Sequence, residues 1–153
     1  MSKPGEQRIA VCDLGSNSFR LVVFSSLGQR WRRTDEIYEP VRIGAGMAET
    51  GELSDDGIAR GLATVEVFAH FCKAAGVDEI DAVATSAIRD AKNAKDFLER
   101  SALEVRVASP DEEARIERAC SCPAHLGVGW CADATLVPRL PLDAVDVADQ
   151  VER

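Results

Sequence analysis

Aromatic residues, positive charge and long apolar runs are all scarce in this sequence. Only 5% of its 153 residues are aromatic, and 18 basic side chains against 26 acidic ones give a formal net charge of −8. Such a chain does not attract nucleic acid or anionic membranes through its overall charge. No apolar run approaches the roughly 18 residues of a membrane span, and the N-terminal MSKPGEQR has no apolar core. We therefore expect no nucleic-acid partner, no membrane partner and no export signal.

Cysteine is present, but without the spacing of a disulfide framework. The five cysteines are an odd number, which fits a reducing compartment, and we predict a cytoplasmic protein. Four potential zinc ligands lie close together near the C-terminus: Cys120, Cys122, His125 and Cys131. Their spacing matches none of the recurring zinc patterns, so the sequence disfavours a zinc site.

The composition is that of one soluble domain. Hydrophobic residues make up 46% of the chain and charged residues 29%, as is usual for globular proteins. A chain of this length buries a sizeable core as a single domain. Because alanine and valine dominate over aromatic residues, the composition favours an α/β protein with a tightly packed sheet and helices.

The N-terminal part predicts three strands joined by hairpins. Apolar patterning places them at 8–13, 19–25 and 30–38, with a turn at Gly28–Gln29 between the second and third. The following segment, VRIGAGMAETGELSDDG (41–57), is rich in glycine and is predicted to be a loop.

Helices and strands alternate in the middle of the chain. A helix is predicted from its N-cap Ser54 to Gly76, with apolar residues at helical spacing between them. A buried strand is predicted at 80–88, a short helix capped by Asn93 next, and a strand at 103–107 after it. Hairpins first and crossover helices afterwards imply a mixed sheet with helices packed on it, so the predicted fold class is α/β.

The last clear helix begins with the capping box SPDE. Ser109 is the N-cap, Pro110 occupies the first helical position, and Glu112 follows three residues after the cap. Glu112 therefore has a structural role, whereas the next residue, Glu113, is not needed for the cap.

The character of the chain changes near residue 120. The residues after 119 hold three of the five cysteines and three of the six prolines, and no periodicity persists there. We predict a domain at 1–119 and an irregular tail at 120–153.

A polar turn between the first two predicted strands has the residues of a phosphate loop. In DLGSNS, backbone amides and hydroxyls around Gly15 suit a phosphate. Asp13 at the strand end can hold a divalent cation, directly or through water. Arg20 can donate two hydrogen bonds to a phosphate. The alternative is a hairpin turn made of ordinary turn-forming residues, with Arg20 facing solvent.

Two later stretches carry further candidates. ATSAIRDAKNA gathers Thr85, Ser86 and Arg89 at the predicted carboxyl end of a strand, where ligands bind in open α/β sheets. The alternative there is an ordinary connection between a strand and a helix.

Glu113 lies near a helix N-terminus, where a carboxylate can deprotonate a water molecule for attack on phosphorus. The alternative for Glu113 is a surface acid.

The order of these stretches resembles the exopolyphosphatase/guanosine pentaphosphate phosphatase family, within the superfamily of actin-like ATPases, sugar kinases and Hsp70. The matching segments are VCDLGSNSFRLVVF, VRIGAGMAETGELSDDGIARGLATVEVF, AVATSAIRDAKNAKDF and EVRVASPDEEAR, over residues 8–118. DLGS alone would occur throughout the superfamily, whereas DLGSNSFRL followed by ATSAIRDAKNA and SPDEEAR is specific.

The resemblance implies a ribonuclease-H-like lobe and a phosphoanhydride hydrolase. The substrate would be inorganic polyphosphate, cleaved at its terminal phosphate, or guanosine pentaphosphate, cleaved at its 5′ γ-phosphate, with Mg²⁺ assisting. Glu113 matches the family's catalytic base, and Asp13 is the implied metal-binding residue. The implied phosphate-binding residues are Gly15, Ser16, Asn17, Ser18, Arg20 and Arg89.

The sequence departs from that family after the predicted helix at Ser109. The family's second phosphate loop, of the type DxGGGS, has no counterpart, since the later glycines, Gly127 and Gly129, lie in LGVGW. The family's site lies between two lobes, so we expect little or no activity from this chain alone. The tail suggests a truncated or frame-shifted product. The alternatives are a phosphate-binding regulatory module, which pairs with itself or with a full-length relative, and a remnant without function.

Overall fold

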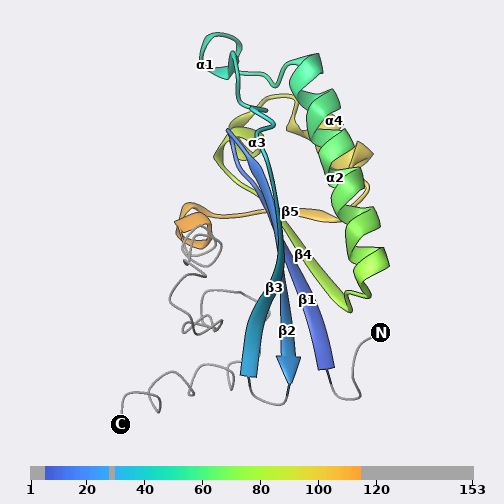
Figure 1. Ribbon diagram of the computed structural model, residues 1–153. Coiled ribbons are helices and arrows are strands. Elements are labelled where there is room, and N and C mark those ends of the chain that lie inside the picture. Colours follow the sequence, from blue (N-terminus) through green and yellow to red (C-terminus); the bar gives the residue numbers. More distant parts are fainter. Residues whose placement is uncertain (1–5, 28–29, 115–153) are drawn as a thin grey trace.

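The protein is built around one five-stranded mixed sheet with the strand order β3-β2-β1-β4-β5. The computed structural model describes residues 6–27 and 30–114 (Figure 1). The strands are β1 (Glu6–Leu14), β2 (Phe19–Leu27), β3 (Arg30–Glu39), β4 (Glu79–Ala84) and β5 (Val105–Val107). The helices are α1 (Met47–Thr50), α2 (Asp55–Ala75), α3 (Ser86–Asp90) and α4 (Ala94–Arg100). A further helical turn begins at Pro110 and is described as far as Ala114.

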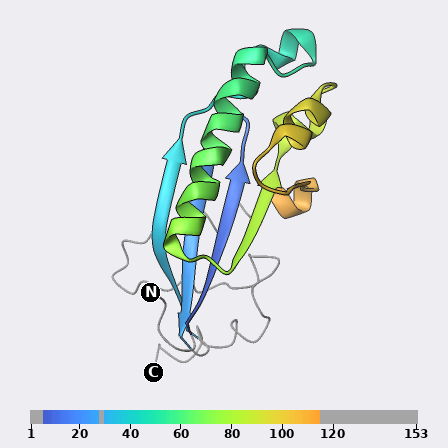
Figure 2. The same ribbon diagram turned by 90° about the vertical axis from the view of Figure 1, so that its right-hand side faces the viewer.

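Strand pairing confirms the predicted mixed sheet. The first three strands form an antiparallel meander, in which β1 pairs with β2 and β2 with β3. β4 and β5 add in parallel beside β1, after crossovers through α2 and through α3 and α4. The carboxyl ends of β1 and β4 therefore meet at the same end of the sheet, where α1, α3 and α4 also lie (Figures 1 and 2).

The main core lies between one face of the sheet and α2, which runs along that face (Figure 2). Alternate side chains of the central strands point into it, as the two-residue period of a strand requires. They are Ala10, Cys12, Leu14, Phe19, Leu21, Val23, Ala82 and Ala84. Phe97 of α4 completes this core with an edge-on contact to Phe19 at a centroid distance of 6.1 Å. The other face of the sheet also carries buried apolar residues, namely Ile9, Val11, Val22, Phe24 and Val83.

Both ends of α2 agree with the prediction. The Ser54 side chain accepts a hydrogen bond from the Gly57 amide, and Gly76 ends the helix in the left-handed conformation at φ 65°. Gly61 is required for packing, because a Cβ there would lie 2.9 Å from the Phe97 ring. The helix thereby lies close against α4, which helps to hold the segment between β4 and β5 over the end of the sheet.

Four local predictions are wrong in detail. The strand predicted at 80–88 ends at Ala84, and the next residues form α3 because Thr85 turns the chain. The predicted loop at 41–57 contains the single-turn helix α1, and β5 is shorter than the predicted strand at 103–107. Asn93 stands at the start of α4 but does not cap it, since its amide pairs with the backbone N–H and C=O of Leu53. The predicted turn at Gly28–Gln29, the disfavoured zinc ligands and the tail at 120–153 lie outside the described residues.

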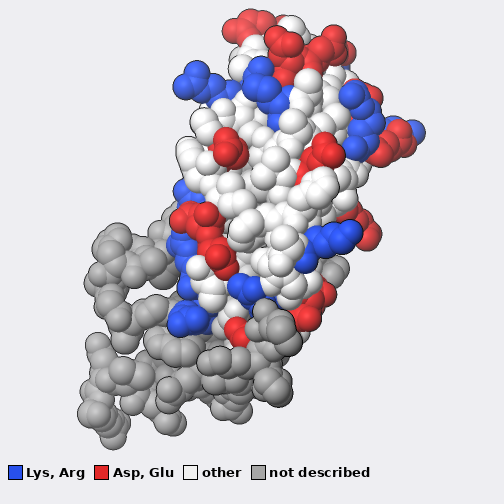
Figure 3. Space-filling model, turned by 45° about the vertical axis from the view of Figure 1, so that its right-hand side comes forward, with Lys and Arg blue, Asp and Glu red and all other residues white. Residues whose placement is uncertain are grey.

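The charged surface is mixed in sign. On the face that Figure 3 shows, acidic and basic side chains alternate, and acidic ones gather over the end where α1 and the start of α2 lie. Asp55 and Asp56 stand in the first turn of α2, where negative charge stabilises the positive end of the helix dipole. Within the described part of the chain, no helix is long and apolar enough to cross a membrane.

Candidate functional site

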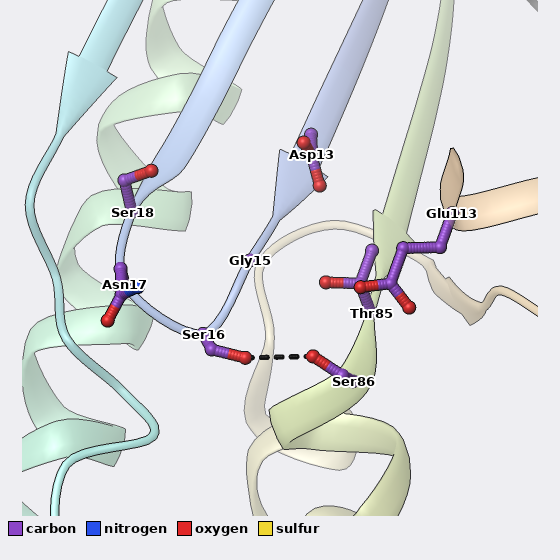
Figure 4. A pocket seen from close by; sticks show the side chains of 8 residues that line it. All are labelled: Asp13, Gly15, Ser16, Asn17, Ser18, Thr85, Ser86 and Glu113. Atoms are coloured by element: carbon purple, nitrogen blue, oxygen red, sulfur yellow. Dashed lines mark hydrogen bonds between the residues drawn. The ribbon is translucent and has the colours of Figure 1, made fainter. Parts of the chain in front are cut away.

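A polar pocket of about 260 Å³ opens at the carboxyl ends of β1 and β4. It brings together three segments that are far apart in the sequence: the end of β1 with the β1–β2 loop (residues 15–18), the β4–α3 junction, and the helical turn that starts at Pro110 (Figure 4). The lining residues are Asp13, Gly15, Ser16, Asn17, Ser18, Thr85, Ser86 and Glu113. Six of the eight site residues implied by the family resemblance therefore line one pocket together with the candidates Thr85 and Ser86, and the two that do not are Arg20 and Arg89.

The β1–β2 loop is fixed in shape by backbone hydrogen bonds. The Gly15 amide donates to the Ser18 carbonyl at 3.0 Å, and a Cβ on Gly15 would lie 2.9 Å from that same oxygen, so only glycine fits without displacing the loop. Outside the loop, the amides of Arg42 and Gly44 donate to the carbonyls of Asn17 and Ser16. The glycine-rich segment after β3 thus clamps the loop from behind.

This clamping engages the carbonyls of Ser16 and Asn17, and the loop residues line the pocket. Within the described part of the chain, no hydrogen bond engages the backbone amides of Ser16, Asn17 or Ser18. Successive amides in a tight turn form a concave binding site for an anion. The geometry therefore suits a phosphate oxygen better than a cation at this wall of the pocket.

The β4–α3 junction forms the facing wall. The amide and hydroxyl of Thr85 both donate to the Leu14 carbonyl, at 3.2 and 3.4 Å, which ties the junction to the end of β1. The hydroxyls of Ser16 and Ser86 lie 2.9 Å apart and are hydrogen-bonded across the pocket (Figure 4). Both hydroxyls can turn toward a bound anion, so this pair adds two adaptable donors.

The helical turn at Pro110 carries Glu113 into the pocket. Its capping box is confirmed, since the Ser109 amide donates to Glu112 and the Glu112 amide donates to the Ser109 hydroxyl. The Ser109 amide and the nearby Arg106 lower the pKa of Glu112. Arg106 is held in turn by two hydrogen bonds to Asp81, a carboxylate only 3% exposed. This chain of ion pairs fixes the turn to β4 and β5, and leaves the side chain of Glu113 directed at the pocket (Figure 4).

Arg89 does not line the pocket, but it forms an ion pair with Glu113, which does. Its Nη1 donates to Glu113 Oε2 at 2.9 Å, and its Nε donates to Asp90 Oδ1 at 3.1 Å. These hydrogen bonds, with that to Glu113 the largest influence, raise the pKa of Arg89. The predicted base and one predicted phosphate-binding arginine are thus in direct contact.

Arg20 lies on β2, opposite Asp13 of β1 in the strand register. Its Nε lies 3.5 Å from the Glu36 carboxylate, and its guanidinium stacks over the Tyr38 ring at 5.5 Å from the ring centre. Arg20 therefore contacts β3 and is not among the residues that line the pocket, and its contact with phosphate stays a prediction.

The donor set of the pocket is compatible with Mg²⁺ that retains water ligands. Asp13 and Glu113 both present carboxylates to the pocket, and no group of three or more His, Cys, Asp or Glu side chains converges anywhere in residues 6–27 and 30–114. Mg²⁺ is commonly bound by one or two carboxylates together with water and substrate phosphates. Asp13 at the strand end fits that role.

The positioning residues around the pocket were not predicted from the sequence. The contacts of Arg42 and Gly44 with the loop depend on a left-handed backbone at Arg42 (φ 53°), a conformation without a clear local signal in the sequence. Asp81 and Arg106 are separated by a helical crossover, so their pairing follows only from the parallel register of β4 and β5. The one available signal was an aspartate inside the apolar run of β4, because such an acid needs a partner.

Comparison with known proteins identifies the family. The model of the Ppx/GppA phosphatase family matches residues 22–128, which is more than half of the chain. The crystal structure of the Aquifex aeolicus member of the Ppx/GppA family is 32% identical with a TM-score of 0.70, over 76% of this chain and 40% of that one. An exopolyphosphatase from Cytophaga hutchinsonii is 25% identical with a TM-score of 0.66, over 72% of this chain and 36% of that one.

This chain spans about 40% of the length of the Aquifex aeolicus protein that it resembles. The shared part is the mixed sheet with its helices, and this confirms the predicted ribonuclease-H-like lobe of the actin-like ATPase superfamily. The boundary at residue 120 stays a prediction. On the family match and the shared fold, the chain belongs to the Ppx/GppA phosphatase family.

Proposed function

We propose that this lobe binds the terminal phosphate of inorganic polyphosphate or guanosine pentaphosphate and supplies the base for its hydrolysis. The observation that carries the proposal is the single pocket in which the β1–β2 loop faces Glu113. The amides and hydroxyls of the loop hold the phosphate oxygens, and the Ser86 hydroxyl adds a donor from the opposite wall.

In the proposed reaction, Glu113 orients a water molecule and accepts its proton as the water oxygen attacks the terminal phosphorus. The bond from that phosphorus to the bridging oxygen breaks, which releases inorganic phosphate and a substrate shorter by one phosphate. Mg²⁺, held through Asp13, would neutralise charge on the phosphates. The loop fits the terminal group itself, and so it supports polyphosphate and guanosine pentaphosphate equally.

Among the described residues, the phosphate donors come from the β1–β2 loop and from Ser86. No acid-led glycine triplet follows residue 114 in the sequence, and positioning on both sides contributes several kcal/mol to such reactions. We therefore propose binding with little or no turnover by this chain alone. The proposed partner, which would supply further donors to the phosphate, is a second copy of this chain or a longer relative.

Phosphate release from polyphosphate and from guanosine pentaphosphate, measured with Mg²⁺, tests this proposal. Release that disappears in Glu113→Gln supports a hydrolase, whereas saturable binding without release supports a non-catalytic phosphate-binding module. Failure to bind either substrate would contradict both.

A further inference from the structure

The ion pair between Arg89 and Glu113 joins two side chains that have separate roles in the proposed function. Arg89 is to bind phosphate, and Glu113 is to accept a proton from water. Arg89 donates through Nη1 to Glu113 and, more weakly, to the Ala108 carbonyl at 3.4 Å, and through Nε to Asp90. Glu113 lines the pocket, and Arg89 does not. The predicted base therefore lies between the pocket and the predicted phosphate-binding arginine.

A guanidinium holds a phosphate best through two parallel N–H bonds from one of its edges. One such edge of Arg89 pairs Nη1 with Nη2, and the other pairs Nε with Nη2. Each edge includes a nitrogen that already donates to a carboxylate, Glu113 in the first case and Asp90 in the second. A phosphate that takes Arg89 in this two-bonded manner therefore competes with one of these carboxylates or, at Nη1, with the weaker Ala108 carbonyl contact.

Glu113 is the carboxylate that an incoming phosphate meets. Its side chain is 28% exposed and faces the pocket, whereas that of Asp90 is 57% exposed and stands outside the lining. A phosphate in the pocket would also repel the Glu113 carboxylate unless the arginine lay between them. The position of Glu113 in the pocket and its repulsion by phosphate both favour replacement of Glu113 by the phosphate at Arg89 Nη1.

We propose that Arg89 exchanges Glu113 for the terminal phosphate, so that the carboxylate becomes free to hold a water molecule only when a phosphate is in place. This inference rests on the proposed function and adds a gate to it. The backbone need not move, because the ion pairs of Glu112 with Arg106 and of Arg106 with Asp81 hold the turn in place. A rotation of the Glu113 side chain completes the exchange.

Binding of inorganic tripolyphosphate, measured by calorimetry at fixed ionic strength, tests the exchange. Glu113→Gln removes the competing carboxylate, and we expect it to bind tripolyphosphate about fivefold to tenfold more tightly than the unchanged chain. Asp90→Asn is the matched control, because it removes the same charge from the same guanidinium outside the pocket. We expect this control to change binding by less than about twofold.

The role of Arg89 is tested by repeating the Glu113 substitution in its absence. In Arg89→Lys, which keeps the charge but cannot form the two-bonded edge, binding should weaken, and Glu113→Gln should then tighten it by less than about twofold. Equal tightening by Glu113→Gln and Asp90→Asn, or no tightening by Glu113→Gln, would overturn the exchange while the phosphate site stands. Absence of saturable binding in every variant would overturn the exchange together with the proposed function.

Discussion

Replacing Arg106 with methionine should destabilise the fold more than replacing its partner Asp81 with asparagine. Asp81 is 3% exposed and accepts two hydrogen bonds from Arg106, at 2.9 and 3.1 Å. Arg106→Met leaves this buried carboxylate without its cation, and removal of one partner from a buried ion pair costs about 3 kcal/mol or more. In Asp81→Asn, the arginine that remains is 31% exposed and keeps Glu112 as a partner, so we expect a loss of about 1 to 2 kcal/mol.

Urea denaturation followed by circular dichroism measures both losses, and the slope of the transition shows whether the unfolded state changes too. Arg100→Met is the matched control, because Arg100 makes a bond of the same 2.9 Å to Asp96 with both side chains more than half exposed. That control should cost less than about 0.5 kcal/mol. The double variant of Asp81 and Arg106 should lose less than the sum of the single losses. A larger loss for Asp81→Asn than for Arg106→Met would show that the buried carboxylate does not depend on Arg106 for its stability.

Three further predictions follow from single contacts. Gly61→Ala should destabilise the chain by about 1 kcal/mol in a thermal melt, because the alanine Cβ would lie 2.9 Å from the Phe97 ring. This loss is expected although alanine has the better helix propensity. An unchanged or higher melting temperature would contradict this packing. Gly15→Ala should abolish tripolyphosphate binding and also lower the melting temperature, because its Cβ would push against the Ser18 carbonyl and shift the loop. Binding at full strength would show that the loop does not hold the anion. The lowered pKa of Glu112 contributes stability above the value of about 4.3 that glutamate has when unfolded, and this contribution disappears as the pH falls through the folded-state pKa. Glu112→Gln should therefore lose less stability than the unchanged chain between pH 5 and pH 3, and equal losses would argue against this role.

The elements that the sequence predicted well are those with a strong local signal. The helix from Ser54 to Gly76 has a side-chain cap at one end and a left-handed glycine at the other, and both act within a few residues. The capping box at Ser109 is equally local, and it separated Glu112 from Glu113 correctly. The strand that was predicted at 80–88 ends at Ala84, because the chain turns at Thr85, and the apolar residues Ala87 and Ile88 that extended the prediction belong to α3.

The remaining features depend on contacts between distant segments. Asn93 has the side chain of an N-cap, but it forms two hydrogen bonds of 2.8 Å with the backbone of Leu53 instead of capping α4. Arg20 was grouped with the phosphate loop by its position in the sequence, and the sequence carried no sign of its contacts with Glu36 and Tyr38 on the neighbouring strand. The pairing of Arg89 with Glu113 joins residues on either side of β5, and sequence patterns carry no information about its geometry.

The central claim is that the β1–β2 loop and the β4–α3 junction together hold a phosphate. Backbone amide shifts in a ¹H–¹⁵N NMR titration with tripolyphosphate and Mg²⁺ test it residue by residue. We expect saturable shifts concentrated at Ser16, Asn17, Ser18 and Ser86, and their loss in Gly15→Ala. Shifts that scatter over the surface, or that leave these amides unchanged at saturation, would contradict it.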